Sequence, residues 1–152
     1  ETPDFTEMPN LEYLDLEKCS SLEEVHNSLV CCGKLIRLNL YHCGRLRRFP
    51  SVNVESLDSL NLQFCSSLEK LPEMLGRTKS ELEIQMANSG IRELPSSIYQ
   101  PEARLTGLYF SGMKNLVALP SSICTLQFLV KLDVSDCSKL KSLPEEIGDL
   151  EN

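Results

Sequence analysis

The sequence predicts a fold of the α/β class, a solenoid in which one short repeat is stacked many times. Three observations lead to this prediction. The chain contains 27 leucines among 152 residues, the leucines return at a nearly constant spacing, and pairs of an apolar residue with proline return at the same spacing. A fixed period of roughly 20 to 50 residues is typical of stacked repeat arrays.

The repeat is best seen in the second and third copies, which place leucine and cysteine at corresponding positions. These positions are Leu35, Leu38, Leu40, Cys43 and Leu46 in one copy, and Leu57, Leu60, Leu62, Cys65 and Leu68 in the next. The pattern is that of a leucine-rich repeat. We predict six copies after the tail of an earlier copy at residues 1–10; they span residues 11–34, 35–56, 57–80, 81–104, 105–128 and 129–152.

Each part of the repeat predicts one element. The Leu-x-Leu core (Leu38 and Leu40, for example) alternates with period two, which is typical of a strand with one buried face. Stacked copies then form a parallel β-sheet on the concave face of a curved horseshoe. The proline that follows suits an extended segment on the convex face, because it lacks an N–H group. Phrases such as Ser96-Ser97-Ile98 and Ser121-Ser122-Ile123 predict short helices or 3-10 turns there, because serine soon after a proline suits the first turn, where free N–H groups need acceptors.

The fourth copy and the two ends of the array depart from the regular repeat. The fourth copy is irregular, since Ile84 and Met86 replace the strand leucines and the turn to Ile91 is one residue shorter. We expect Gly90 to provide a positive φ in that turn. Neither end of the chain has a polar capping repeat, so we expect a segment of a longer array, truncated at both ends.

Composition and motifs exclude several functions. A net charge of −7 argues against nucleic-acid binding, and no apolar run is long enough to span a membrane. We find no phosphate-binding loop, no Cys-x-x-Cys pair and no histidines at metal-ligand spacing, which predicts no enzyme activity, no cofactor and no metal. Cys19, Cys43, Cys65 and Cys137 share one repeat position, and we interpret them as small buried residues with a weak S–H donor.

The remaining candidate function is binding of a protein by the surface. Residues between the strand leucines and just after them point out of the concave sheet, and the aromatic ones are typical interface anchors. The candidate protein-binding residues are Tyr13, Asp15, Arg37, Asn39, Tyr41, His42, Asn61, Gln63, Phe64, Gln85, Tyr109, Lys131 and Asp133. A second candidate is a basic patch in the second copy, formed by Lys34, Arg45, Arg47 and Arg48. Ordinary solvent exposure and charge compensation between copies are the alternatives.

The phrase L-x-x-L-x-L-x-x-C-x-x-L-x-x-L-P, together with SGIRELPSSI and CSKLKSLPEEIGDLEN, resembles the leucine-rich repeats of plant intracellular immune receptors. The resemblance is to the class that joins a TIR domain, a nucleotide-binding domain and leucine-rich repeats. It implies a cytoplasmic or nuclear receptor whose repeats recognise a pathogen effector protein, restrain the receptor's own nucleotide-binding domain, or do both. The TIR domain of that class hydrolyses NAD, and no motif of it or of the nucleotide-binding domain occurs in this chain.

Two alternatives to a recognition module stay open at this point. The repeats could be a structural spacer that holds neighbouring domains apart, or a receptor-like extracellular domain. The chain has no Asn-x-Ser/Thr glycosylation site, which speaks against the extracellular alternative.

Overall fold

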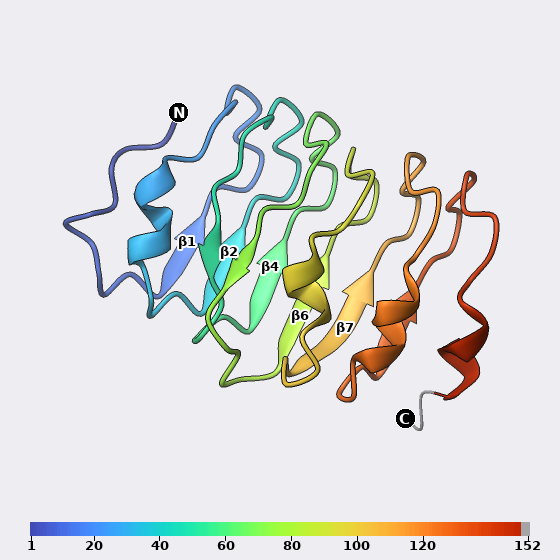
Figure 1. The fold of residues 1–152 in the computed structure, drawn as a ribbon. Helices are drawn as coiled ribbons and strands as arrows, with labels where there is room; N and C mark the ends of the chain where they lie inside the picture. The colour runs from blue at the N-terminus through green and yellow to red at the C-terminus, as the bar shows by residue number, and fades with distance from the viewer. Residues whose placement is uncertain (150–152) are drawn as a thin grey trace.

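The chain winds into stacked turns, and each turn adds one strand to a single sheet (Figure 1). The computed structural model describes residues 1–149, so the last three residues of the predicted sixth copy lie outside the described residues. In this described part of the chain, the sheet has six parallel strands in the order β1-β2-β4-β6-β7-β8. Their bounds are Tyr13–Asp15, Arg37–Asn39, Ser59–Asn61, Leu82–Gln85, Leu105–Tyr109 and Lys131–Asp133.

The register of the sheet follows the leucine pattern from one turn to the next. The central residues pair in one continuous row: Leu14, Leu38, Leu60, Ile84, Leu108 and Leu132. In β2, β4, β6 and β7 these side chains are buried. Apolar residues with period two therefore stack their buried faces between neighbouring strands, which confirms the predicted parallel sheet of a leucine-rich-repeat solenoid.

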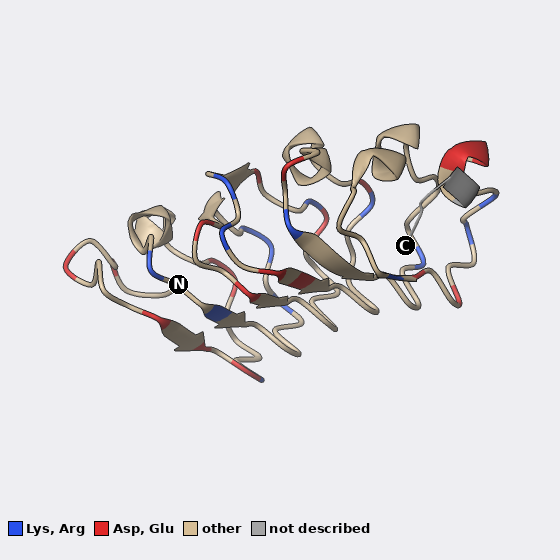
Figure 2. Ribbon diagram, turned by 90° about the horizontal axis from the view of Figure 1, so that it is seen from below, with Lys and Arg blue, Asp and Glu red and all other residues tan. Residues whose placement is uncertain are grey.

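Within residues 1–149, the face opposite the sheet carries four short 3-10 helices (Figures 1 and 2). They are η1 (Asn27–Cys31), η2 (Ser96–Tyr99), η3 (Ser121–Thr125) and η4 (Glu145–Asp149). Serine begins the first turn of η2 and η3 as predicted, but Pro95 and Pro120 occupy the cap positions and no side chain caps either helix by a hydrogen bond. The Ser97 hydroxyl instead accepts a hydrogen bond from the backbone N–H of Met74 in the previous turn, at 2.9 Å.

The second and third turns differ from the prediction on this opposite face. In place of 3-10 helices they form β3 (Val52–Asn53) and β5 (Met74–Leu75), a two-stranded parallel sheet. The local sequence gives the reason in the second turn, because Val52 and Val54 are buried while Asn53 between them is half-buried. Alternating β-branched residues favour an extended chain over a helical turn.

The repeated cysteine position links successive turns by hydrogen bonds. The Cys43 thiol donates to the carbonyl of Leu16, the Cys65 thiol to Leu40 and the Cys137 thiol to Phe110, at 3.1 to 3.2 Å. Burial raises the pKa of the Cys65 thiol to about 12, so this group stays a protonated donor. The expectation that all four cysteines are buried is wrong for Cys19, which is exposed, and Cys137 is half-buried. Both belong to end turns that have one described neighbour.

Ser89 occupies the cysteine position of the fourth turn and leads to a prediction. Its hydroxyl is buried and has no hydrogen-bond partner among the described residues. Because a buried unsatisfied hydroxyl is destabilising, Ser89→Ala should raise the free energy of unfolding by about 1 kcal/mol, measured by urea denaturation. Ser66→Ala is the control, since the Ser66 hydroxyl does donate, to the carbonyl of Gly44 at 3.3 Å. A loss of stability in Ser89→Ala would contradict the prediction.

The positive φ expected at Gly90 is also wrong. In the fourth turn Asn88 adopts it, with φ 57°. Gly90 is buried, and glycine is required at this position because the backbone of the previous turn passes close to it. A Cβ there would overlap the carbonyl oxygen of Ser66. Corresponding residues of other turns also have positive φ: Lys18, His42, Phe64, Gly112 and Asp136.

Candidate protein-binding surface

The predicted surface residues lie in columns across the sheet, as the register shows. One column pairs Asp15, Asn39, Asn61, Gln85, Tyr109 and Asp133 in adjacent strands. A second column, at the start of the strands, contains Tyr13, Arg37 and Lys131. Tyr41, His42, Gln63 and Phe64 follow the ends of β2 and β4. The side chains of these candidates are half-buried or exposed.

Four residues of the first column also stabilise the turn that follows their strand, a role that was not predicted. They are Asp15, Asn39, Asn61 and Asp133. In each, a side-chain oxygen accepts a hydrogen bond from the backbone N–H two residues later, at 2.9 to 3.0 Å. Hydrogen bonds from Ser135 accordingly lower the pKa of Asp133. Asp and Asn at the end of a strand are typical of such turns, and that signal was present in the sequence. The oxygens that make these bonds are therefore already engaged.

Three aromatic side chains form a cluster where β2 and β4 end, which we call the Tyr41–His42–Phe64 cluster. The ring centroids of Tyr41 and Phe64 lie 5.6 Å apart in an edge-to-face arrangement, and those of His42 and Phe64 lie 5.6 Å apart and stacked. The Phe64 side chain is 38% exposed. Contacts between the rings hold each of them in place, so the cluster presents an ordered apolar surface to solvent.

The backbone at this cluster is strained. His42 and Phe64 both have φ 60°, a conformation that crowds Cβ against the following carbonyl oxygen. Glycine, asparagine and aspartate adopt it more readily than a bulky aromatic residue, and these three types are found in the fourth, fifth and sixth turns. The backbone is fixed nevertheless, because the Phe64 N–H donates to the Ala87 carbonyl at 2.9 Å.

A second ordered group lies on the sheet in the later turns. The Tyr109 hydroxyl and the Lys131 ammonium both lie within 3.4 Å of one oxygen of Glu83. Contacts with Tyr109 and Glu83 raise the pKa of Lys131. Gly107 leaves the space for this group, because a Cβ there would lie 2.9 Å from the Tyr109 ring. Tyr109 and Lys131 are thus brought together, but their polar groups are already paired.

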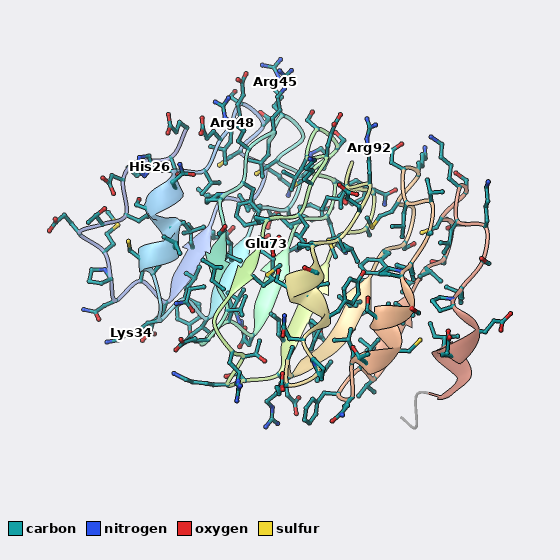
Figure 3. All side chains as sticks on the ribbon, viewed as in Figure 1. His26, Lys34, Arg45, Arg48, Glu73 and Arg92 are labelled. Carbon is teal, nitrogen blue, oxygen red and sulfur yellow. The ribbon has the colours of Figure 1, made fainter. Side chains whose placement is uncertain are left out.

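The predicted basic patch does not form one surface. Lys34 and the pair Arg45 and Arg48 lie at opposite edges of the solenoid (Figure 3). The Lys34 ammonium donates to Asn10 at 2.7 Å, and Arg48 pairs with Glu24 of the previous turn. Among the four predicted residues, Arg45 and Arg47 are left as exposed cations, which is too few for a basic docking site.

Ion pairs between successive turns are a recurrent feature of the edges, where acidic and basic segments alternate (Figure 2). Lys79 pairs with Glu55 at 2.8 Å, and Arg92 pairs with Glu69 at 3.1 Å. These pairs are exposed, so they contribute little to stability individually. They show that much of the charge on this chain balances the charge of the neighbouring turn.

Within residues 1–149, no group of three or more His, Cys, Asp and Glu side chains is arranged to hold a metal ion. The same part of the chain contains no helix with the length and apolar character needed to cross a membrane.

The fold and the surface together define a leucine-rich-repeat module, a protein-interaction fold rather than a catalytic domain. A family model described as "Disease resistance protein RPS4B-like, leucine-rich repeats" matches residues 53–147. The chain belongs to this family of leucine-rich repeats from disease resistance proteins.

Relatives with curated names agree with this assignment. The chain is 66% identical over 151 residues to TMV resistance protein N of Nicotiana glutinosa, covering 99% of this chain and 13% of that protein. It is 37% identical over 141 residues to Disease resistance protein RPP2A of Arabidopsis thaliana, covering 92% of this chain and 9% of that protein. The chain therefore spans a small part of the length of these relatives.

A solved structure of a leucine-rich-repeat protein from Leptospira interrogans matches with 19% identity and a TM-score of 0.31, covering 97% of this chain and 54% of that one. A similarity at this level adds no support to the assignment.

Proposed function

We propose that this chain is a protein-recognition module of a plant immune receptor and that it binds a pathogen effector protein through the Tyr41–His42–Phe64 cluster. The receptor would act in the cytoplasm or the nucleus, and the same repeats would restrain its nucleotide-binding domain. The names of the relatives and the resemblance of the repeat phrases support the receptor and its pathogen partner.

The observation that carries the proposal is the strained, exposed aromatic cluster. Aromatic residues held rigidly on a surface are typical centres of protein interfaces, since little conformational entropy is lost when they bind. A phenylalanine at φ 60° is unfavourable for folding, and the fourth turn shows that asparagine fits the same position. A bulky aromatic residue kept at a position where asparagine is less strained points to a functional role for its ring.

Phe64→Asn tests the proposal, because it should separate binding from folding. Asparagine adopts the positive φ more easily but loses the ring contacts with Tyr41 and His42, so we expect the two effects to offset and the free energy of unfolding to change by less than about 1 kcal/mol. Loss of a central aromatic anchor should weaken binding of the cognate effector about 30-fold, corresponding to about 2 kcal/mol. Urea denaturation measures the free energy of unfolding, calorimetry with the purified effector measures binding, and the response of the full receptor to the effector reports the effect on function.

Phe128→Ala is the matched control, since the Phe128 side chain is 41% exposed and lies outside the cluster. It should leave effector binding unchanged. An unchanged response of the Phe64→Asn receptor would overturn the role of the cluster.

A structural spacer is the second candidate, and the side-chain hydrogen bonds and ion pairs between turns favour it. Replacing these turns by the same number of consensus repeats distinguishes the two functions. A spacer would retain the full response to the effector, whereas a recognition module would lose it.

A further inference from the structure

A cleft of about 320 Å³ enters the solenoid between the third and fourth turns, away from the outer surface of the sheet. Its apolar walls are formed by Val54, Met74, Leu82, Ile84, Ile98 and Leu105. These side chains are at most 8% exposed, so they belong to the core. The cleft thus reaches from the surface to the inner side of β6.

Two departures from the regular repeat meet at this cleft. The face opposite the sheet changes there from strand β5 to 3-10 helix η2, which do not follow the same path. The register of β6 and β7 also shifts, since Leu82 pairs with Leu105 but Glu83 pairs with Gly107. The additional residue, Thr106, forms a β-bulge, a feature that is common beside functional sites. Where the turns do not match, their side chains cannot fill the space between them.

The polar residues at the cleft give it a chemical preference. Arg77 lines it and is exposed, and this guanidinium makes no hydrogen bond or ion pair with any residue from 1 to 149. Its neighbours Lys79 and Arg104 each pair with an acid, Lys79 with Glu55 and Arg104 with Glu81. Arg77 is thus available for a ligand, and a guanidinium binds a carboxylate through two parallel hydrogen bonds.

Size and charge limit the ligand further. An apolar cavity of roughly 150 Å³ holds benzene, so a cleft about twice that size fits a bicyclic ring system. Cavities from roughly 300 Å³ upward are typical of small-molecule sites. Glu102 also lines the cleft and is exposed, so a second negative charge on the ligand would be repelled.

We infer that this cleft binds a small apolar monocarboxylic acid, with its ring system against Met74 and Ile98 and its carboxylate on Arg77. The inference is independent of the proposed function, because the cleft and the Tyr41–His42–Phe64 cluster share no residue.

The test uses 2-naphthoic acid as the probe and 2-naphthalenemethanol as its uncharged analogue, each titrated into the chain by fluorescence. We expect saturable binding of the acid at one site. Arg77→Gln should weaken binding of the acid about tenfold, because a charge-assisted pair is lost, and should change binding of the alcohol less than about twofold. Absence of saturable binding would overturn the site, and equal weakening of both probes would overturn the preference for an acid.

Two variants that fill the cleft locate the binding. Ala103→Phe places an aromatic ring inside the cleft. Gln100→Trp places a larger ring at the cleft entrance, and the fold tolerates this substitution because Gln100 is exposed. Both should abolish binding of the acid while the thermal unfolding midpoint shows that the protein is folded. Ala118→Phe is the control, because Ala118 is exposed and lies outside the cleft. Retention of binding in folded Gln100→Trp would show that the probe binds elsewhere and would overturn the inference.

Discussion

Gly90→Val should destabilise the protein by about 3 kcal/mol, because two backbone segments approach each other at this residue. A Cβ on Gly90 would overlap the carbonyl oxygen of Ser66 and would lie 3.0 Å from that of Leu68. Both are backbone atoms, so no side chain can rotate away to relieve the contact. The Gly90 N–H also donates to the Cys65 carbonyl at 3.1 Å, and a shift of the chain would break this bond. Overpacking of this kind typically costs about 1–3 kcal/mol, to which the lost hydrogen bond adds.

Gly44 provides the matched control, since it follows the cysteine position in the second turn as Gly90 follows Ser89 in the fourth. A Cβ on Gly44 would lie 3.7 Å from the nearest atom, the Ser66 hydroxyl oxygen, which is an ordinary contact. Gly44→Val should therefore change the free energy of unfolding by less than about 0.5 kcal/mol in urea denaturation. Equal effects of the two substitutions would contradict the close approach and would point to a general requirement for glycine at this position.

The register and the buried column of the sheet could be predicted from the sequence because both depend on one short-range property. Leu38 and Leu40 alternate with the residues beside them, and the same alternation returns in every turn, so the strands can stack in one register only. The candidate surface columns followed from the same alternation. The structure pairs Asp15, Asn39 and Asn61 in adjacent strands as the repeat predicts.

What could not be predicted depends on contacts between turns. Asn39 looked like a recognition residue, but its side-chain oxygen accepts the Tyr41 N–H, a bond that depends on the backbone conformation after the strand. Lys34 and Arg45 are near in sequence, yet the strand between them carries them to opposite edges (Figure 3). The positive φ at Phe64 and the cleft beside Arg77 follow from the mismatch or strain of particular turns. A single repeat phrase contains no information of this kind.

The strain at Phe64 and the cleft beside Arg77 share a physical basis. A solenoid makes most of its contacts between neighbouring turns, so an unfavourable residue in one turn is tolerated when the adjacent turns pack well. The turns on either side of Phe64 contribute the fully buried Leu40 and Met86. A repeat array can therefore vary its surface residues and even its local geometry while the leucine column maintains the fold.

Phe110→Ala should cause the largest loss of stability, about 3–5 kcal/mol, because it leaves a cavity in the interior of the stack. Phe110 is fully buried and occupies the position that Leu40 and Leu62 hold in earlier turns. Its carbonyl also accepts the Cys137 thiol and the Met113 N–H, so a collapse around the cavity would disturb the contact between the fifth and sixth turns. Phe128→Ala removes a ring that is 41% exposed, and it should cost less than about 1 kcal/mol.

Hydrogen exchange shows where the loss of Phe110 acts. Because each turn depends on its neighbours, the sixth turn should lose protection before the second and third turns do. The backbone N–H of Phe110, which donates to Asp133 at 2.7 Å, reports the contact directly. Uniform loss of protection along the chain would contradict this expectation. It would mean that the solenoid opens as one cooperative unit and that the sixth turn cannot unfold separately from the others.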